Sequence, residues 1–503
     1  MSAQLVPSSL LDPKFATQEH EWLHRSVHTL RQRAPEMSAH TVFSKPQLGI
    51  AGIGTFAIAF AAVARPIFAL QVLTAIATVA YALSLGYRLI LIRQGIRGDC
   101  VVKVTDEEAL SIKDQELPRY TVLIPAYREP EVIGKVMDAV SALIYPADRL
   151  DVRLLLEADD LETIAAARSV QGSVPMTIVL VPSGEPRTKP KACNFGLQSA
   201  DGDLVTIFDA EDRPEPLQLR RAVVALRRLG SAFACVQAQL GYFNSRQNLI
   251  TRWFAIEYGT WFRFLLPGLV SVKAPIPLGG TSNHFRTDIL KAVGAWDAFN
   301  VTEDADLGIR LSRLGFSVGV LESTTFEEAN SDFVNWVKQR SRWYKGYLQT
   351  WLVHLRQPRL VHKELGWRGA VGLHLFIAGT PLMALINPVF WVLSIMWFAR
   401  HPALIHTVFP SWVFFVGFTC FVLGNATIIY VNALTTREMR EPGLLGAAFV
   451  VPLYWVMMSA AAAKAVFQLV ANPFYWEKTS HGLDDKRTPR TRPENEVPVP
   501  VIL

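Results

Sequence analysis

Charged residues are scarce in this chain of 503 residues: they make up 19% of it, against roughly 25% in soluble domains. Hydrophobic residues make up 50%, so the composition argues against a purely soluble enzyme. Cysteine is scarce too, and the four cysteines lack the paired spacing of a zinc site or a disulfide framework (Cys100, Cys193, Cys235 and Cys420). No small-residue cleavage site of the signal-peptide type stands out near the first apolar stretch, so we expect the N-terminus to remain on the protein.

The hydrophobic residues are concentrated in four stretches that are poor in charge, at 48–93, 369–398, 411–434 and 443–472. Residues 100–240 have instead the pattern of an ordinary α/β domain. The net charge is +6, and the basic residues crowd beside the apolar stretches. That placement is typical of loops that face anionic cytoplasmic lipid, and it favours a lipid bilayer over nucleic acid as partner. The sequence therefore predicts a membrane protein with a large water-facing part.

The first apolar stretch is long enough for two spans of about 20 residues, because Arg65-Pro66 interrupts it. Basic residues on both flanks place both ends of this predicted hairpin in the cytoplasm. Two further spans are expected at about 370–398 and 411–434. A crossing by the last stretch would violate the positive-inside rule, and Pro452 together with the polar stripe Lys464, Gln468 and Asn472 predicts an interfacial or re-entrant segment there.

Short aliphatic and β-branched runs alternate with helical patterns between residues 119 and 235, which predicts a parallel sheet with crossover helices. The expected strands are Tyr120–Pro125, Val152–Leu156, Met176–Val181, Leu204–Asp209 and Phe233–Gln237. In such a sheet, ligands bind at the carboxyl ends of the strands. The polar residues that follow these strands should therefore meet in one cleft.

Two segments, around 250–266 and after Asp332, combine aromatic residues at helical spacing with basic residues. This pattern suits a helix that lies at a membrane interface. An aromatic stripe buried in a soluble core is the alternative interpretation of both segments.

Three groups of residues have the chemistry of a transferase site. Asp209-Ala210-Glu211-Asp212 follows a buried strand, where carboxylates can hold a hard divalent cation, although a helix cap or surface turn is the common alternative. Asp304 of Thr302-Glu303-Asp304 can accept a proton from an attacking hydroxyl, although these residue types also form a capping box. Gln339-Arg340-Ser341-Arg342-Trp343 adds arginines that suit a diphosphate and an indole that suits a sugar ring.

In this combination the sequence resembles the processive, membrane-embedded branch of glycosyltransferase family 2, which includes cellulose, chitin and hyaluronan synthases. The matching elements stand in family order between residues 122 and 343. They are Val122–Tyr127 with Glu129, Glu157–Asp160, Lys191–Asn194, Asp209–Asp212, Gly279–Ser282, Thr302–Asp304 and Gln339–Trp343.

The resemblance implies an α/β domain of the GT-A type, inserted between transmembrane helices, which takes a nucleotide sugar and Mg²⁺ or Mn²⁺. The residues implied to bind the nucleotide and its diphosphate are Tyr127, Glu129, Glu157 or Asp159, Lys191, Asp209, Arg340 and Arg342. The residues implied for the metal are Asp209 and Glu211, and those for catalysis are Asp304, as base, with Glu303. The residues implied to bind the acceptor or to close over the substrate are Gly280, Thr281, Gln339, Trp343 and Trp476.

Two motifs depart from the usual family pattern. The metal motif reads Asp-x-Glu in place of Asp-x-Asp, so either Glu211 or Asp212 completes the pair. The first acidic motif reads Glu-Ala-Asp-Asp, which leaves Glu157 and Asp159 as alternatives for the nucleotide contact. Trp476 resembles a gating element of hyaluronan-type synthases, and a terminal interfacial anchor is its equal alternative. No Arg-rich domain of the PilZ type follows the last apolar stretch, which argues against direct control by a cyclic dinucleotide.

These features predict an inverting, metal-dependent synthase that extends a β-linked glycan from a cytoplasmic nucleotide sugar and passes it across the plasma membrane. Accessory export or regulatory proteins are possible further partners. Transfer of one sugar to a lipid carrier is the first alternative, and an inactive nucleotide-sensing membrane protein is the second. We expect a cytoplasmic segment (1–46), a transmembrane hairpin (47–94), the catalytic domain (95–330), an interfacial helix (331–368), two spans (369–440), an interfacial or re-entrant segment (441–480) and a disordered tail (481–503), with both termini cytoplasmic.

Overall fold

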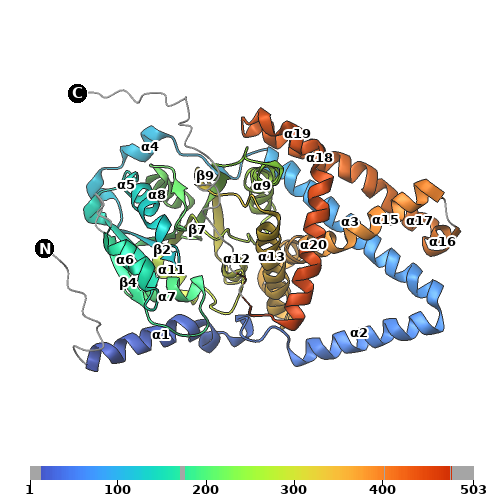
Figure 1. Ribbon diagram of the computed structural model, residues 1–503, viewed down its shortest axis with the longest axis horizontal. Coiled ribbons are helices and arrows are strands. Elements are labelled where there is room, and N and C mark those ends of the chain that lie inside the picture. The colour runs from blue at the N-terminus through green and yellow to red at the C-terminus, as the bar shows by residue number, and fades with distance from the viewer. Residues whose placement is uncertain (1–12, 170–175, 401–402, 476, 478–503) are drawn as a thin grey trace.

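A computed structural model describes residues 13–169, 176–400, 403–475 and 477. Within these residues, a sheet of nine strands forms the centre of the water-facing part (Figure 1). The strands are β1 (Val101–Val102), β2 (Tyr120–Ala126), β3 (Leu150–Glu157), β4 (Met176–Val181), β5 (Leu204–Ile207), β6 (Arg213–Pro214), β7 (Phe233–Tyr242), β8 (Asn283–Arg286) and β9 (Ser317–Glu327). The five predicted strands are therefore confirmed as β2, β3, β4, β5 and β7.

The sheet order is β1-β9-β7-β8-β5-β2-β3-β4, and β6 pairs with β9. Most neighbours are parallel: Tyr120 of β2, for example, lies opposite both Leu150 of β3 and Leu204 of β5. Strand β8 runs antiparallel to both β5 and β7, a reversal that the sequence did not predict. The sheet is thus mixed and mainly parallel, as expected for the GT-A type.

Alternation along β2 divides the domain core into two layers. Val122 and Ile124 pack in one hydrophobic cluster with α5 and α8, whereas Leu123 packs in another with α7. This is the two-residue period of a strand that is buried on both faces. The helices of this domain are α4 (Asp106–Ser111), α5 (Ile133–Ser141), α6 (Leu161–Ser169), α7 (Lys189–Gln198), α8 (Gln218–Leu229), α11 (Thr287–Ala292) and α12 (Glu303–Arg313).

Five helical segments are long and apolar enough to cross a membrane, by length and composition. They are α2 (Lys45–Ala64), α3 (Pro66–Ile96), Pro358–Ala399, Ser411–Glu438 and α20 (Val451–Ala471). Helices α2 and α3 meet at Arg65-Pro66 and diverge in an open V (Figure 1). The four expected spans coincide with four of these segments. The fifth, α20, lies in the stretch predicted to be interfacial, and Pro452 is its second residue rather than a break within it. Its position relative to a bilayer stays a prediction.

The third and fourth of these segments contain several helical elements. They are α14 (Pro358–Gly372), the π-helical turn η7 (Leu373–Ala378), α15 (Gly379–Arg400), α17 (Ser411–Thr419), the π-helical turn η8 (Cys420–Gly424) and α18 (Asn425–Glu438). The remaining helices are α1 (Pro13–Arg33), α9 (Leu249–Thr260), η6 (Trp261–Leu265), α10 (Leu266–Ser271), α13 (Phe333–His354), α16 (Ala403–Val408) and α19 (Leu445–Phe449).

Helices α9, α13 and α20 lie between the sheet and the other apolar helices (Figure 1). The two aromatic, basic segments of the sequence form α9 and α13, and their aromatic residues pack inward: Trp336 of α13 is fully buried against Tyr454 of α20. This agrees with the interpretation as a buried stripe for these side chains, while an interfacial depth for α13 stays a prediction.

One glycine lets α13 approach the catalytic domain. A Cβ atom at Gly346 would lie 2.3 Å from the side chain of Thr302, at the start of α12. Only glycine fits there without displacement of one element. The helix with the Gln339–Trp343 motif is therefore held directly against the turn that carries Glu303 and Asp304.

Candidate active site

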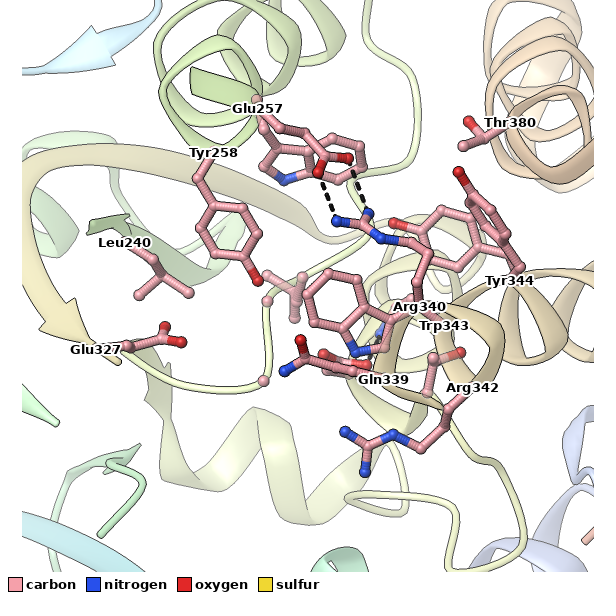
Figure 2. Close-up of a pocket in the computed structure, with 18 of the residues that line it drawn as sticks. Leu240, Glu257, Tyr258, Glu327, Gln339, Arg340, Arg342, Trp343, Tyr344 and Thr380 are labelled. Atoms are coloured by element: carbon pink, nitrogen blue, oxygen red, sulfur yellow. Dashed lines mark hydrogen bonds and ion pairs between the residues drawn. The ribbon is translucent and has the colours of Figure 1, made fainter. Parts of the chain in front are cut away.

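One large cavity, of about 640 Å³, extends from the carboxyl ends of the strands to the apolar helices. Its wall brings together residues from distant parts of the sequence, from Tyr81 of α3 to Met458 of α20, and Figure 2 shows a part of this wall. The predicted site residues that line it are Tyr127, Glu129, Glu157, Asp209, Glu211, Gly280, Thr281, Glu303, Asp304, Gln339, Arg340, Arg342 and Trp343. Asp159 and Lys191 do not line it, and Trp476 lies outside the described residues.

The acidic turn after β5 is held in shape by Asp212. One carboxylate oxygen of Asp212 accepts hydrogen bonds from the Asp209 backbone N–H, at 2.7 Å, and from the Thr281 hydroxyl. Burial, followed by the charges of Asp209 and Glu211, raises the pKa of Asp212 well above its usual value. Because Asp212 is turned inward to fix the loop, Asp209 and Glu211 are the carboxylates of this motif that face the cavity.

Lys189 is the cation nearest to this turn, and the sequence analysis did not identify it. Its ammonium group pairs with the Asp209 carboxylate and donates to the Gly280 carbonyl oxygen at 2.7 Å. Lys189 begins α7, two residues before the predicted Lys191. The predicted motif Lys191–Asn194 begins two residues later, so the sequence pattern pointed to the start of α7 but not to Lys189 itself.

The donor atoms at this end of the cavity suit a hard divalent cation. Besides Asp209 and Glu211, the half-buried Glu327 of β9 lies within their electrostatic reach. Burial of its carboxylate, followed by the charges of Asp212, Asp209 and Glu211, raises the pKa of Glu327 well above the usual value. One oxygen of Glu327 and one of Asp212 are buried with no hydrogen-bond partner among the described residues. No three His, Cys, Asp or Glu side chains of the described part of the chain are grouped closely enough to hold a metal alone. A cation would therefore need oxygens of the substrate as well.

Glu303 and Asp304 lie at the start of α12, opposite Lys189. The Asp304 carboxylate accepts the Ala305 backbone N–H at 2.8 Å, and its other oxygen lies 3.6 Å from the position a Cβ atom on Gly280 would take. Burial is the largest cause that raises the pKa of both carboxyl groups, while Lys189 and Arg342 oppose it. An acid whose pKa is raised toward neutrality suits a group that must both accept and release a proton.

The two arginines of the Gln339–Trp343 motif point in opposite directions from α13 (Figure 2). Arg340 forms a two-fold ion pair with Glu257 of α9, with one N–H···O distance of 2.8 Å, and its guanidinium lies 4.5 Å from the Trp343 ring centroid. Arg342 leaves the helix on the side of Gly346, and its charge acts on Glu303, Asp304 and Asp209. The structure thus brings Arg342 to the acidic residues, whereas Arg340 is engaged elsewhere.

Glu257 and Tyr454 complete the surroundings of the indole, and no sequence pattern identified them. The Tyr454 hydroxyl donates to the Glu257 carboxylate at 2.7 Å and lies 3.2 Å from the Trp336 indole nitrogen. Helices α9, α13 and α20 are therefore joined by a polar network directly beneath Trp343. Gln339 lies on the same side of α13 as Trp343, and its side-chain oxygen accepts a hydrogen bond from Asn330 at 2.7 Å.

The first acidic motif forms the opposite wall of the cavity. Glu157 lines the wall and pairs with the fully buried Lys191 at 2.8 Å, so Lys191 lies behind Glu157. Asp159 pairs with Arg187 at 2.7 Å on the rim, and Arg187 also donates to the Tyr127 hydroxyl at 3.4 Å. Glu157 is thus the member of the motif on the cavity wall, and Asp159 reaches the site through Arg187.

Tyr475 and Glu477, on either side of position 476, form hydrogen bonds with α13 and α20. Glu477 accepts hydrogen bonds from Lys464 at 2.9 Å and from Gln468 at 3.1 Å. Both donors belong to the predicted polar stripe. Lys345 of α13 donates to the Tyr475 carbonyl oxygen at 2.6 Å. The polar stripe therefore holds the chain that leaves α20 beside the motif helix.

Residues 118–346 match the family model described as "Glycosyltransferase like family 2". Over these residues the chain is similar to family 2 glycosyltransferases. This match and the sheet topology confirm the predicted GT-A-type fold of the domain, and the domain spans both the acidic turn after β5 and the motif helix.

Three relatives illustrate what the chain is similar to. A probable glycosyltransferase, YdaM, of Bacillus subtilis is 29% identical over 46% of this chain and 56% of its own length. The beta-monoglucosyldiacylglycerol synthase of Synechocystis is 27% identical over 76% of this chain and 80% of its own. A probable glucomannan 4-beta-mannosyltransferase of Arabidopsis thaliana is 28% identical over 48% of this chain and 56% of its own. The chain thus spans just over half the length of the first and third relatives.

Among solved structures, the fold is similar to a mannosyltransferase from Pyrobaculum calidifontis in complex with GDP-Man and Mn²⁺. The two chains are 19% identical, with a TM-score of 0.47, over 76% of this chain and 99% of the other.

Proposed function

We propose that this protein is an inverting, metal-dependent polysaccharide synthase, which extends a β-linked glycan from a nucleotide sugar and passes the product into the membrane helices. The observation that carries the proposal is the single cavity that joins the acidic residues to the apolar helices. At its membrane end it is lined by three asparagines, Asn387, Asn425 and Asn432, on α15 and α18. Amide groups inside a membrane are costly unless they face a polar path or ligand, and a glycan provides such a ligand.

The donor would lie at the acidic end of the cavity. Tyr127, Glu129 and Glu157 form the wall that suits the nucleoside, with Asp159 and Arg187 on its rim. Asp209 and Glu211 would hold a divalent cation together with the diphosphate, and the cation would neutralise charge on the leaving group. Arg342 is placed to contact the same diphosphate, because its charge acts on Asp209 and Asp304 at this end of the cavity, whereas Arg340 is paired with Glu257.

The transfer is a single displacement. The acceptor hydroxyl oxygen attacks the anomeric carbon, the bond from that carbon to the diphosphate oxygen breaks, and its electron pair leaves with the diphosphate. The hydroxyl proton passes to the Asp304 carboxylate, while Glu303 and Lys189 set the charge around Asp304. Attack from the side opposite the leaving group converts an α-linked donor into a β-linked product.

The acceptor would rest on Trp343. The indole face suits the C–H face of a sugar ring, Gln339 offers an amide on the same side of α13, and Gly280 and Thr281 approach from the sheet. The glycan would then continue past Tyr454 toward the apolar helices. The membrane location, with the catalytic domain and both termini in the cytoplasm, is part of the same proposal.

The test is to incubate the purified full-length protein with a panel of radiolabelled nucleotide sugars and Mg²⁺ or Mn²⁺, and to measure product size. A ladder or a high-mass smear that linkage-specific β-glycosidases digest is expected. A product of one added sugar that is extracted into organic solvent would contradict the synthase.

Transfer of one sugar to a lipid is the second candidate. It is favoured by the Synechocystis relative, whose name describes a glycolipid synthase and whose similarity covers 76% of this chain, which is more than the catalytic domain alone. The same Asp304 chemistry would apply, with a lipid hydroxyl as the nucleophile. Product size and extractability separate the two candidates in one experiment.

A further inference from the structure

Arg88 is a charged residue within an apolar helix, and it lines the same cavity. It lies eight residues before the end of α3 at Ile96, which is about 12 Å along the helix at about 1.5 Å per residue. A charge at such a depth is costly, and arginines in membrane helices face protein interiors or polar cavities and mark functional sites.

The contacts of Arg88 leave its positive charge uncompensated. It donates to the Thr380 hydroxyl of α15 at 2.6 Å, and its guanidinium lies 5.4 Å from the Phe376 ring centroid. Among the ion pairs of the described residues, none includes Arg88. Glu257 is the carboxylate whose field reaches it, but Glu257 is already bound to Arg340 and Tyr454. This end of the cavity therefore has a surplus positive charge.

Hydroxyl and amide groups surround the guanidinium. Tyr344 and Tyr347 of α13 and Tyr81 of α3 lie close enough to Arg88 to interact with its charge, and all three line the cavity. The Tyr81 hydroxyl lies 3.5 Å from the side-chain oxygen of Asn387. A guanidinium with several free N–H donors beside hydroxyl and amide groups has the composition of a site for an acidic sugar: the fork suits a carboxylate and the neutral groups suit sugar hydroxyls.

We propose that the membrane end of the cavity binds a sugar unit of the acceptor that carries a carboxylate, and that Arg88 holds this carboxylate. The proposal rests on the proposed function and specifies its acceptor: the glycan contains uronic acid units. Thr380 positions the guanidinium by its hydrogen bond from α15.

The test compares two disaccharides that differ in charge, cellobiouronic acid and cellobiose. Binding of each to the purified full-length protein is measured by microscale thermophoresis in wild type, Arg88→Gln, Arg88→Lys and Arg93→Gln. Arg93 lies on the same helix, is exposed and does not line the cavity, so Arg93→Gln is the matched control for loss of one positive charge. Thermal unfolding verifies that each variant is folded.

Wild type and Arg93→Gln should prefer the uronate disaccharide by roughly tenfold or more, as a hydrogen-bonded charge provides. Arg88→Gln should bind both disaccharides equally. Arg88→Lys keeps the charge without the two-pronged geometry, so it should retain only part of the preference. If Arg88→Gln does not fold, this partial loss in Arg88→Lys, relative to Arg93→Gln, tests the same point.

Equal binding of both disaccharides by wild type, or an undiminished preference in both Arg88 variants, would overturn the proposal. A preference for farnesyl phosphate over farnesol that Arg88→Gln abolishes, without any preference between the disaccharides, would overturn the sugar assignment in favour of a lipid phosphate. These binding results do not depend on polymer formation. A synthase that makes a neutral glycan would thus refute the role of Arg88 alone, whereas a one-sugar lipid product would refute the proposed function.

Discussion

The ion pair between Glu257 and Arg340 provides a quantitative test of how the acceptor platform is held. Two N–H groups of Arg340 and the Tyr454 hydroxyl donate to the Glu257 carboxylate, and Arg340 lies under Trp343. Glu257→Gln keeps the shape of the side chain, but replaces one acceptor oxygen by an NH₂ group that faces Arg340 and Tyr454. Donors would then oppose donors, and Arg340 would lose its counter-ion.

The expected effects follow from these contacts. Hydrogen bonds to a charged group contribute about 1.5–3 kcal/mol each, and loss of one partner of a fully buried pair costs about 3–5 kcal/mol. Because the Glu257 side chain is 25% exposed, we expect a loss of about 2–4 kcal/mol in the free energy of unfolding. The cation–π contact with Trp343 contributes about 0.5–2 kcal/mol, so acceptor binding should weaken by about 2- to 30-fold.

The assay compares Glu257→Gln with Glu364→Gln. Glu364 pairs with Arg313 at 2.7 Å, and the exposed fractions of its pair, 24% and 2%, are close to the 25% and 7% of Glu257 and Arg340. Glu364 does not line the cavity. Thermal unfolding in detergent should show both variants destabilised. Only Glu257→Gln should raise the acceptor KM and shorten the product, while nucleotide affinity stays within about twofold of wild type. Equal KM values in the two variants would refute the role of Arg340 beneath Trp343.

Three further predictions concern chemistry and topology. EDTA and Asp209→Asn should each abolish transfer, measured with the radiolabelled donor, without a change in thermal unfolding that would indicate misfolding; full activity in EDTA would contradict the metal assignment. Asp304→Asn should retain nucleotide binding while turnover falls by roughly 10²–10⁴-fold. Because burial raises the pKa of Asp304 and the base must be ionised, kcat of the wild type should fall as the pH drops through a value above the usual aspartate range. The pH profile of the variant should lack this fall. A cysteine introduced near position 406 should be labelled from outside intact cells and one at position 485 should not; labelling at 485 would exclude the four-span arrangement.

The sheet could be predicted because its strands are nearly continuous hydrophobic runs. Val122, Leu123 and Ile124 are all buried, since β2 has helices on both faces, and such runs are readable without any structure. The acids at strand ends were readable for the same reason, as the carboxyl ends of parallel strands meet at one edge. The reversal of β8 had no comparable signal: Asn283–Arg286 is short and polar, and its direction is set by its neighbours β5 and β7.

Contacts between distant segments could not be predicted in this way. Glu257 lies in a helix whose local pattern is aromatic, and its importance comes from Arg340, 83 positions later. Lys189 was overlooked in favour of Lys191, because the sequence does not reveal that the first of them faces Asp209 while the second is buried behind Glu157. Burial and partnership of this kind depend on how the elements pack, which composition and spacing do not contain.

The division of labour along α13 is nevertheless a consequence of helix geometry. Successive residues are about 100° apart, so Arg340 and Arg342 leave α13 about 160° apart, on nearly opposite sides of the helix. Arg340 shares a face with Trp336 and Tyr344, which pack with Tyr454 and Trp253 in one hydrophobic cluster. Arg342 shares a face with Gly346, which touches Thr302 beside Glu303 and Asp304. One side of the helix thus holds the acceptor platform and the other reaches the leaving group. A shift of α13 by one residue would turn both arginines by about 100°, and a shift by two would nearly exchange these sides. The close approach at Gly346 therefore matters to catalysis, because it fixes the register of α13 against Thr302. A Gly346→Ala variant that kept full activity would show that this register is not what places Arg342.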